Sequence, residues 1–434
     1  MRKLDIIKCP FTVVNDKYIS RVVDTLLDDI LNISGAVLIE GPKWCGKTRT
    51  AKNKAKSTLY VQDPDTRDST LKLADTTPSV LLKGEVPRLI DEWQLAPKLW
   101  DAVRFTVDER NMPGQFILTG SATPEYDEKR HTGTGRFFKL FMRPMSLFES
   151  GESNGSVSLR ELFNSTAKIE GSSDLSIEKL AFVMARGGWP GLLNDSERSA
   201  LMKVQNYVNF IVDEDMSRVD GVKRNPVAIR NLLKSLSRNN STTAGLSTIW
   251  KDMNGDDDTI SDKTVSSYIN ALRRIFIVED VPGWNPSLRS KTAIRTAPKR
   301  NFVDPSIAIA ALNTTPKGLL NDFNTFGFMF ESLCVRDMRV YSQPLNGDVF
   351  HFRDKNGLEI DIIVQLRDDR WGAIEVKLGS KEIEMGAKNL LKLKERTDTD
   401  RMKQPSFLMI LTSTGYAYKR DDGILIVPIG CLRD

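Results

Sequence analysis

The chain has 434 residues, of which 40% are hydrophobic and 27% charged, and its formal net charge is +5. This length suits two to four globular domains, and so mild a basic excess leaves nucleic-acid binding to a local cluster of basic residues. The four scattered cysteines, two histidines and short apolar runs exclude a histidine-ligated zinc site and a membrane-spanning helix, so we expect a cytoplasmic protein without a signal peptide.

Five apolar runs in the first third alternate with helical patterns, as βα units do. The runs are nearly continuous rather than alternating, which is typical of strands buried on both faces. They occupy residues 35–40, 58–65, 86–94, 114–122 and 136–146. The sequence therefore predicts an α/β domain whose parallel sheet is covered by helices on both faces.

A glycine-rich loop follows the first of these runs and precedes a lysine-rich helical stretch. Gly41, Gly46, Lys47 and Thr48 complete the pattern G-x-x-x-x-G-K-[ST] of a phosphate-binding loop. In such a loop the backbone amides surround the phosphates, the lysine neutralises them and the threonine ligates magnesium. The sequence thus predicts ATP and Mg²⁺ as cofactors, bound by the whole loop: Gly41, Pro42, Lys43, Trp44, Cys45, Gly46, Lys47, Thr48 and Arg49.

Polar side chains end the third and fourth of these runs. Asp91 can hold magnesium through water, and Glu92 can orient and polarise the attacking water. Ser121 or Thr119 can sense the terminal phosphate, although such residues also cap turns. Together with the loop, these side chains predict nucleotide hydrolysis.

The middle third, from about residue 164 to residue 312, has the apolar spacing of helices. Ser261 should cap one helix, and a short strand is expected after it at residues 276–281. The apolar stripe of that helix is Val265, Tyr268, Ile269, Leu272 and Phe276. Helices predicted at residues 226–239 and 242–253 precede it, so this order resembles a winged helix-turn-helix.

A basic linker without acidic residues follows at residues 284–300. Its basic residues are Arg289, Lys291, Arg295, Lys299 and Arg300. Beside a winged helix, such a segment can be a wing that contacts the phosphates of DNA. The alternative is a mobile basic loop.

The last third, from about residue 321, mixes helical and strand patterns and indicates a separate α/β domain. A hairpin centred on Asp368 would place Asp361 across from Glu375, with their β-carbons roughly 5 Å apart. Lys377 shares the face of Glu375 because alternate residues of a strand share a face. Two facing carboxylates repel unless a cation lies between them, so this cluster predicts either a metal site or a solvated hairpin face.

The motifs together resemble the AAA-type P-loop ATPases, and more narrowly a large prokaryotic family of uncharacterised ATPases with a C-terminal DUF4143-like domain. The matching segments span nearly the whole chain in the family order: GPKWCGKT, LIDEWQ, ILTGSATP, GTGRFFKLFMRPMSLFE, ARGGWPG, RNFVDPSIA, GLEIDIIV and IEVKLG. By this resemblance Arg136 is a candidate arginine finger for the nucleotide of a neighbouring subunit, which implies a homo-oligomer. The alternative is that Arg136 is a surface arginine that begins a strand. In the segment ARGGWPG, the resemblance makes Arg186 a candidate second sensor of phosphate.

The D…E-x-K arrangement of Asp361, Glu375 and Lys377 resembles the restriction-endonuclease-like nucleases. That comparison makes Asp361 and Glu375 magnesium ligands and Lys377 the assisting catalytic residue, and Glu331 an additional ligand. Such domains also persist as binding modules, so cleavage stays open. The expected domains are an ATPase domain (1–160), a helical lid (161–225), a winged-helix-like domain (226–320) and a nuclease-fold domain (321–434).

Three functions compete at this stage. The first is an ATPase that acts on DNA through the winged-helix and nuclease-like domains. The second is a regulatory ATP switch whose C-terminal domain only binds DNA or protein. The third, a small-molecule kinase, is disfavoured by Glu92 beside Asp91 and by the long accessory domains. DNA and a second copy of the chain are the expected partners, and no membrane is expected.

Overall fold

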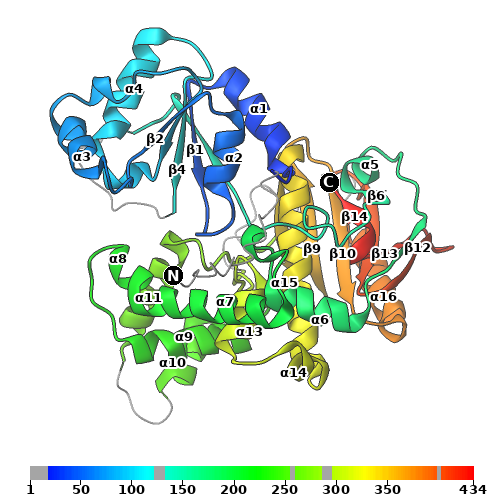
Figure 1. Ribbon diagram of the computed structural model, residues 1–434. Coiled ribbons are helices and arrows are strands. Elements are labelled where there is room, and N and C mark those ends of the chain that lie inside the picture. Colours follow the sequence, from blue (N-terminus) through cyan, green and yellow to red (C-terminus); the bar gives the residue numbers. More distant parts are fainter. Residues whose placement is uncertain (1–17, 122–131, 255–259, 286–295, 398–401) are drawn as a thin grey trace, which may run out of the picture.

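The computed structural model describes residues 18–121, 132–254, 260–285, 296–397 and 402–434 (Figure 1). An N-terminal parallel sheet with helices, a central helical region and a C-terminal mixed sheet with helices follow one another. This confirms the predicted α/β class and its order of parts. Among the described residues, no helix combines the length and the apolarity that crossing a membrane would require.

The N-terminal sheet contains the five predicted strands, and all of its neighbouring strands are parallel. Its order is β2-β3-β4-β1-β5. The strands are β1 Ala36–Glu40, β2 Ser57–Tyr60, β3 Arg88–Asp91, β4 Phe116–Gly120 and β5 Phe137–Phe141. Because the strands are parallel, the loops after β1, β3 and β4 meet at one edge of the sheet.

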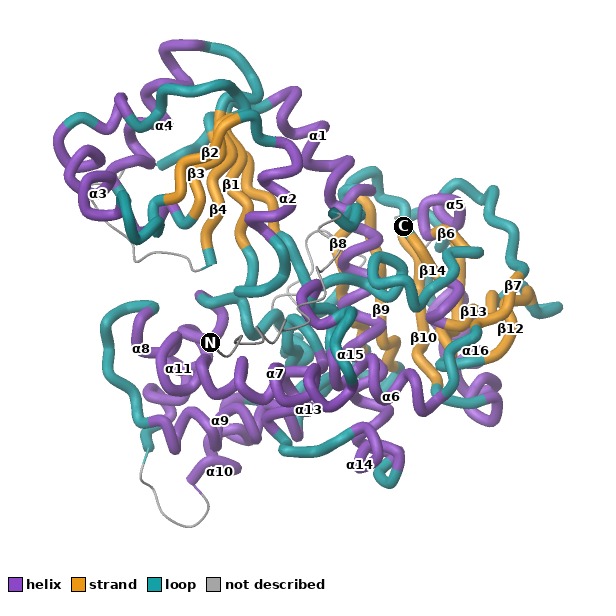
Figure 2. Tube along the Cα trace, in the orientation of Figure 1, coloured by secondary structure: helices purple, strands orange, loops and turns teal. Residues whose placement is uncertain are grey.

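Helices cover both faces of this sheet, as Figure 2 shows. Alternate residues of β1 explain why: Ala36 and Leu38 pack with one apolar cluster that includes α4, whereas Val37 and Ile39 pack with another that includes α1 and α2. The helices are α1 Val23–Ile33, α2 Lys47–Lys54, α3 Arg67–Thr76 and α4 Lys98–Arg110. The continuous apolar runs are therefore needed to fill two cores.

The central region consists of helices packed around α13, whose residues up to Ala310 are buried. Ser261 caps α11 as predicted, with its hydroxyl accepting a hydrogen bond from the Thr264 amide at 3.2 Å. The helices are α6 Ile177–Arg186, α7 Glu197–Phe210, α8 Met216–Arg218, α9 Pro226–Arg238, α10 Leu246–Asn254, α11 Asp262–Arg274, α13 Pro305–Ala311 and α14 Pro316–Leu320. A π-helical turn at Ile211–Asp215 joins α7 to α8.

The region after α11 differs from the prediction in two respects. The helix ends at Arg274, and Phe276 lies beyond it with a left-handed φ of 61°, so Phe276 is not part of the helical stripe. Residues 276–281 form no continuous strand, only antiparallel bridges from Val278 to Phe302 and from Val281 to Lys299. We call residues 278–284 and 296–302 the wing stems, because they hold the place of a wing after three helices.

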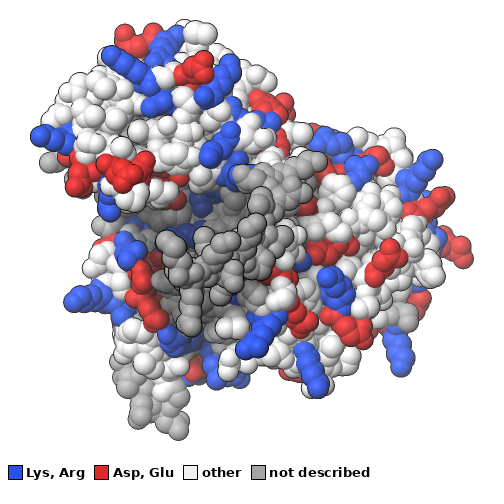
Figure 3. All heavy atoms as spheres, viewed as in Figure 1, with Lys and Arg blue, Asp and Glu red and all other residues white. Residues whose placement is uncertain are grey.

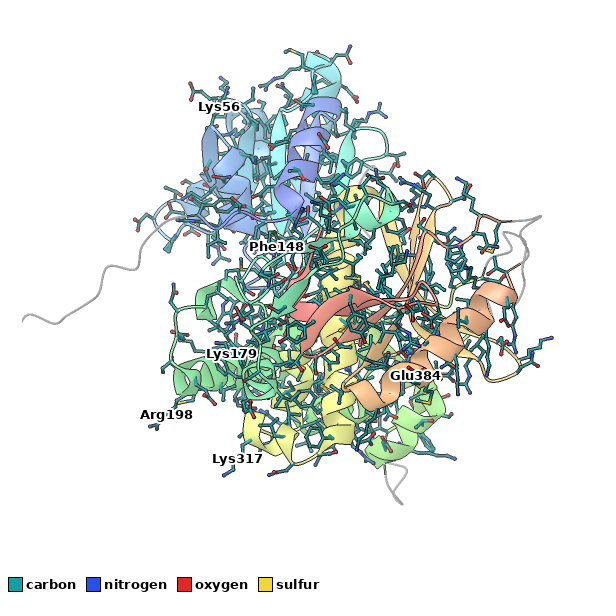
Figure 4. All side chains as sticks on the ribbon, turned by 90° about the vertical axis from the view of Figure 1, so that its right-hand side faces the viewer. Lys56, Phe148, Lys179, Arg198, Lys317 and Glu384 are labelled. Atoms are coloured by element: carbon teal, nitrogen blue, oxygen red, sulfur yellow. The ribbon has the colours of Figure 1, made fainter. Side chains whose placement is uncertain are left out.

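The C-terminal sheet is mixed and has the order β7-β12-β13-β11-β10-β9-β8. Helix α15 Phe323–Ser342 packs on one face and α16 Ile383–Glu395, which carries Glu384, on the other (Figure 4). The strands are β7 Gly171–Ser173, β8 Gly347–Arg353, β9 Glu359–Leu366, β10 Trp371–Lys377, β11 Phe407–Thr412, β12 Gly415–Lys419 and β13 Leu425–Pro428. The sequence did not predict β7, β12 or β13.

A segment that follows the ATPase sheet joins the C-terminal part of the chain. Strand β6 Val157–Ser158 pairs with β14 Leu432–Arg433, and β7 pairs with β12. Helix α5 Leu159–Phe163 lies between them. The expected boundary at residue 160 therefore falls inside a segment whose strands pair with the end of the chain.

Candidate functional site

The phosphate-binding loop connects β1 to α2, as its motif predicts. Gly41 and Gly46 have φ angles of +153° and +104°, and a β-carbon on Gly41 would lie 2.1 Å from the Met142 carbonyl oxygen, so Gly41 can have no side chain. The buried Lys47 ammonium donates to the carbonyls of Gly41 and Pro42, both at 2.8 Å. The loop thus presents its amides at the N-terminal end of α2, where helices bind phosphate.

The acidic residues after β3 are held in two different places. Asp91 is fully buried and accepts hydrogen bonds from Thr48 Oγ1 at 2.7 Å, Thr119 Oγ1 at 2.6 Å and Gln62 Nε2 at 3.2 Å. Glu92 has a left-handed φ of 56°, and among the described residues its side chain shares no hydrogen-bond partner with that of Asp91. The carboxylate of Asp91 therefore faces the threonine of the loop, while that of Glu92 has a separate set of partners.

Glu92 is held by two polar neighbours. Its Oε2 accepts a hydrogen bond from Ser121 Oγ at 3.1 Å and another from the Gln94 amide. Ser121, predicted as a phosphate sensor, thus lies beside the predicted catalytic carboxylate, whereas Thr119 bonds to Asp91 instead. Gln94 was not predicted, although it stands only two residues after Glu92.

A cavity of about 870 Å³ opens beside these groups. It is lined by the loop residues Lys43, Trp44 and 46–49, by Gln62, Glu92 and Ser121, and by residues of the central region. Its size lies within the range of ligand pockets, roughly 300–1,000 Å³. The central residues that line it are Tyr207, Asp215, Arg218, Val219, Ile275 and Ile277.

The central region contacts the tip of the phosphate-binding loop directly. Lys43 pairs with Asp215 at 2.5 Å, and Trp44 stacks on Tyr207 with ring centroids 5.2 Å apart and an interplanar angle of 17°. The Tyr207 hydroxyl also donates to the Lys43 carbonyl at 3.3 Å. Cys45 is buried, and its carbonyl accepts a hydrogen bond from Arg21 at 2.8 Å. Lys43 and Trp44, at positions that the motif leaves unspecified, therefore hold the central helices to the loop.

Arg136 lies far from the phosphate-binding loop of its own chain. It precedes β5, whose first residue, Phe137, pairs with Ala36 at the end of β1 opposite the loop. Its half-exposed side chain pairs with Asp108 at 2.8 Å. Arg136 does not line the cavity, so it can reach a nucleotide only in another copy of the chain.

Arg186 does not reach the cavity either. Its buried side chain pairs with Glu152 at 2.6 Å. The glycines after it serve packing, because Gly188 donates its amide to Asp304 at 3.0 Å and a β-carbon on Gly187 would lie 2.4 Å from Ser306 Oγ. The motifs ARGGWPG and RNFVDPSIA thus pack against each other, and Arg218 is the arginine of the central helices that lines the cavity.

The second candidate site, in the C-terminal domain, has the predicted hairpin register. Trp371 pairs with Gln365 and Ile374 with Ile362, which centres the hairpin on Asp368 and makes Asp361 and Glu375 the next residues along the two strands. Glu375 is buried, so the face is not a solvated one. Asn389 of α16 donates to Glu375 at 3.2 Å.

Two lysines lie between the carboxylates of this cluster. Lys377 pairs with Glu375 at 2.5 Å and with Asp361 at 3.5 Å. Lys299 pairs with Glu331 at 2.6 Å and with Asp361 at 3.3 Å. Within the described ranges, no three carboxylate, histidine or cysteine groups gather as metal ligands, and the predicted magnesium ligands Asp361, Glu375 and Glu331 are paired with lysines.

Burial and charge shift the pKa values in this cluster in opposite directions. Burial raises the pKa of Glu375 to about 8, beside Asp361, and that of Glu331 to about 7. Burial also favours neutral Asp361 and Lys299, but their charged partners lower the pKa of Asp361 and raise that of Lys299. Asp361 and Lys299 thus favour their charged forms, whereas Glu375 and Glu331 keep their protons to a higher pH than exposed glutamates do.

The basic linker is only partly described. Arg289, Lys291 and Arg295 lie outside the described residues. Lys299 is buried in the cluster, and Arg300 donates to the Ala244 carbonyl at 3.0 Å and to Asp280 at 2.9 Å. These two basic residues therefore bind protein groups of their own chain. Basic and acidic side chains are interspersed on the face seen in Figure 3.

Comparisons with known proteins match three segments of the chain. Residues 34–150 match the model of an AAA domain, residues 177–318 that of a domain of unknown function, DUF8612, and residues 326–432 that of another, DUF4143. The DUF8612 match covers parts of both the expected lid and the expected winged-helix domain. No curated protein matches the chain.

Two solved structures are similar at low identity. One is the Walker-type ATPase PABY2304 of Pyrococcus abyssi, at 14% identity and a TM-score of 0.39 over 66% of this chain and 94% of that one. The other is PCH-2 of C. elegans, at 13% identity and a TM-score of 0.22 over 58% and 67%. Both TM-scores are too low to establish a shared fold. On the family matches and its strand-loop-helix geometry, the chain joins an AAA-type P-loop ATPase domain to a DUF8612 domain and a C-terminal DUF4143 domain.

Proposed function

We propose that this protein hydrolyses ATP with magnesium and couples hydrolysis to DNA binding through the central helices. The observation that carries the proposal is the separation of the two acidic residues after β3. Asp91 faces Thr48, and Glu92 is held by Ser121. One carboxylate can thus serve the metal while the other serves the attacking water, which is the division of labour that hydrolysis needs.

The residues present fit a magnesium ion. Thr48 and Asp91 supply a hydroxyl and a carboxylate oxygen 2.7 Å apart, and magnesium prefers such oxygen ligands together with water. Bound there, the ion supplies positive charge to the phosphates. Lys47 leaves the carbonyls of its own loop to neutralise the outer phosphates, and Glu92 accepts a proton from the attacking water.

The link to DNA rests on the position of α11. Ile275 and Ile277, which directly follow this helix, line the nucleotide cavity. The exposed face of α11 carries Lys263, Ser267 and Asn270, which can donate hydrogen bonds to bases or phosphates. A helix that touches the cavity at its end and exposes a polar face can report the nucleotide state to a duplex.

A second candidate function is a regulatory ATP switch with a non-cleaving C-terminal module. The observation that favours it is the pair of lysines within the carboxylate cluster. Two ammonium groups already neutralise carboxylates that a nuclease would offer to a metal ion. In this function the C-terminal domain binds a partner without cutting it.

The test is an ATP hydrolysis assay with and without duplex DNA, using Lys47→Ala and Glu92→Gln. We expect Lys47→Ala to lose ATP binding, and Glu92→Gln to keep binding but lose about 100-fold or more in turnover. Lys52→Ala, an exposed lysine on the same helix α2, is the matched control and should hydrolyse normally. Full turnover in Glu92→Gln would refute the catalytic assignment, and wild-type turnover indifferent to DNA would favour the regulatory switch.

A further inference from the structure

Lys299 is a buried cation at the junction of the central region and the C-terminal domain. Its side chain is 7% exposed, and its ammonium lies 2.6 Å from Glu331 of α15 and 3.3 Å from Asp361 of β9. A buried ammonium is costly unless it is paired, and here both partners are carboxylates. The two carboxylates therefore stabilise the buried ammonium of Lys299.

The cluster around Lys299 is an alternating row of acidic and basic side chains. Glu331, Lys299, Asp361, Lys377 and Glu375 follow one another through ion pairs of 2.6, 3.3, 3.5 and 2.5 Å. Asp361 has both oxygens in use, since Oδ1 meets Lys299 and Oδ2 meets Lys377 and the Val376 amide at 2.9 Å. The central carboxylate thus has both of its oxygens engaged by protein groups.

The backbone of Lys299 belongs to a wing stem that is fixed to the C-terminal sheet. Lys299 and Val281 exchange two backbone hydrogen bonds of 2.9 Å. The neighbouring Trp284 amide donates to the His351 carbonyl of β8 at 2.6 Å, and the His351 amide donates to Pro282 at 3.0 Å. The side chain of Lys299 therefore enters the cluster from a segment that itself lies on the sheet.

We propose that Lys299 is a built-in cation that closes the carboxylate cluster against divalent metal ions and fastens the wing stems to the C-terminal domain. A divalent ion would need the oxygens that Lys299 engages, and its charge would repel the ammonium at short range. Metal can enter only when Lys299 withdraws, which also releases the stem. This deepens the non-cleaving candidate function and does not depend on ATP hydrolysis.

The experiment measures the melting temperature of nucleotide-free full-length protein with and without Mn²⁺. We expect Mn²⁺ to raise the melting temperature of wild type by no more than it raises that of an Asp361→Asn variant. Lys299→Met, with the cation removed, should melt lower without metal and gain roughly 4 °C at a Mn²⁺ concentration about 100-fold above Kd. Lys299→Met/Asp361→Asn should lose that gain.

Two matched variants separate this effect from general loss of charge. Lys299→Arg keeps the cation, so Mn²⁺ should not raise its melting temperature. Arg300→Met is the control for lost charge, because it removes the next basic residue, which pairs with Asp280 outside the cluster. An equal Mn²⁺ response in wild type and Lys299→Met overturns the proposal. If Lys299→Met does not fold, equilibrium Mn²⁺ binding to wild type decides, because binding that Asp361→Asn abolishes shows that Lys299 does not close the site.

Discussion

His351 offers a direct test of how tightly the wing stems lie on the C-terminal sheet. This side chain is 1% exposed, and its Nε2 lies 3.0 Å from the Ala297 carbonyl, so the neutral ring donates there. Burial, with Lys299 as the next cause, lowers the pKa of His351 from 6.5 to about 4, and Arg353 acts in the same direction while Asp361 opposes it. We predict that His351→Gln, which keeps an amide donor, removes a specific acid sensitivity from the protein.

The sign follows from proton binding. Because the folded pKa lies below the unfolded one, the unfolded chain binds more protons, and stability falls as the pH drops from 6.5 toward 4. Between pH 8 and pH 5 the two pKa values give a loss of about 2 kcal/mol from this one group. The ring would remain neutral in the folded protein over that range.

The assay is urea unfolding of wild type and His351→Gln at pH 8 and pH 5, monitored by tryptophan fluorescence. Other groups titrate in the same range, so the quantity of interest is the difference between the two proteins in the pH-dependent change of unfolding free energy. Wild type should lose about 2 kcal/mol more than the variant. Equal losses would mean that His351 is solvated in the folded state, and the close contact of the stems with β8 would be refuted.

Two further predictions concern Arg136, which can act only on a neighbouring copy, and Arg218, which lines the cavity. Arg136→Ala should keep ATP binding but lose about 1,000-fold or more in hydrolysis if it acts on a neighbouring copy. Mixing it with Lys47→Ala, which retains Arg136, should restore part of the activity, and failure to do so would contradict action in trans. Arg218→Ala should weaken ATP binding about tenfold, since it removes a cation that lines the cavity, measured as the Kd of a fluorescent ATP analogue. Unchanged affinity would exclude contact between Arg218 and the nucleotide.

The ATPase sheet could be predicted because the apolar runs of the sequence coincide with the strands of the sheet. The apolar runs of β1, β3 and β4 are buried strands, and the polar residues that end them lie at the edge where parallel strands present their loops. Strands β2 and β5, at the two sides of the sheet, are only partly buried. The same rule could have found Gln62, which follows β2 and bonds to Asp91. The register about Asp368 was also predictable, because a short hairpin turn leaves few alternatives.

What the sequence could not supply is the pairing of distant segments. Lys299 stands among basic residues and reads as a phosphate contact, yet its partners are 32 and 62 positions away along the chain. Arg218 likewise carries no local signal, because only the fold of the central helices brings it to the loop. Strand β7 pairs with β12 across more than 240 residues, and three residues are too few to show a period.

The segment after α11 connects the nucleotide cavity to the carboxylate cluster of the C-terminal domain. Ile277 lines the nucleotide cavity, and Phe276 beside it packs on Phe141 of β5, with ring centroids 5.4 Å apart. Farther along, Glu279 pairs with Arg143 at 2.5 Å, and Val281 holds the backbone of Lys299. A nucleotide that displaces Ile277 thus acts on a segment anchored in the ATPase sheet at one end and in the carboxylate cluster at the other. Lys299 therefore lies where such a displacement would reach the C-terminal domain.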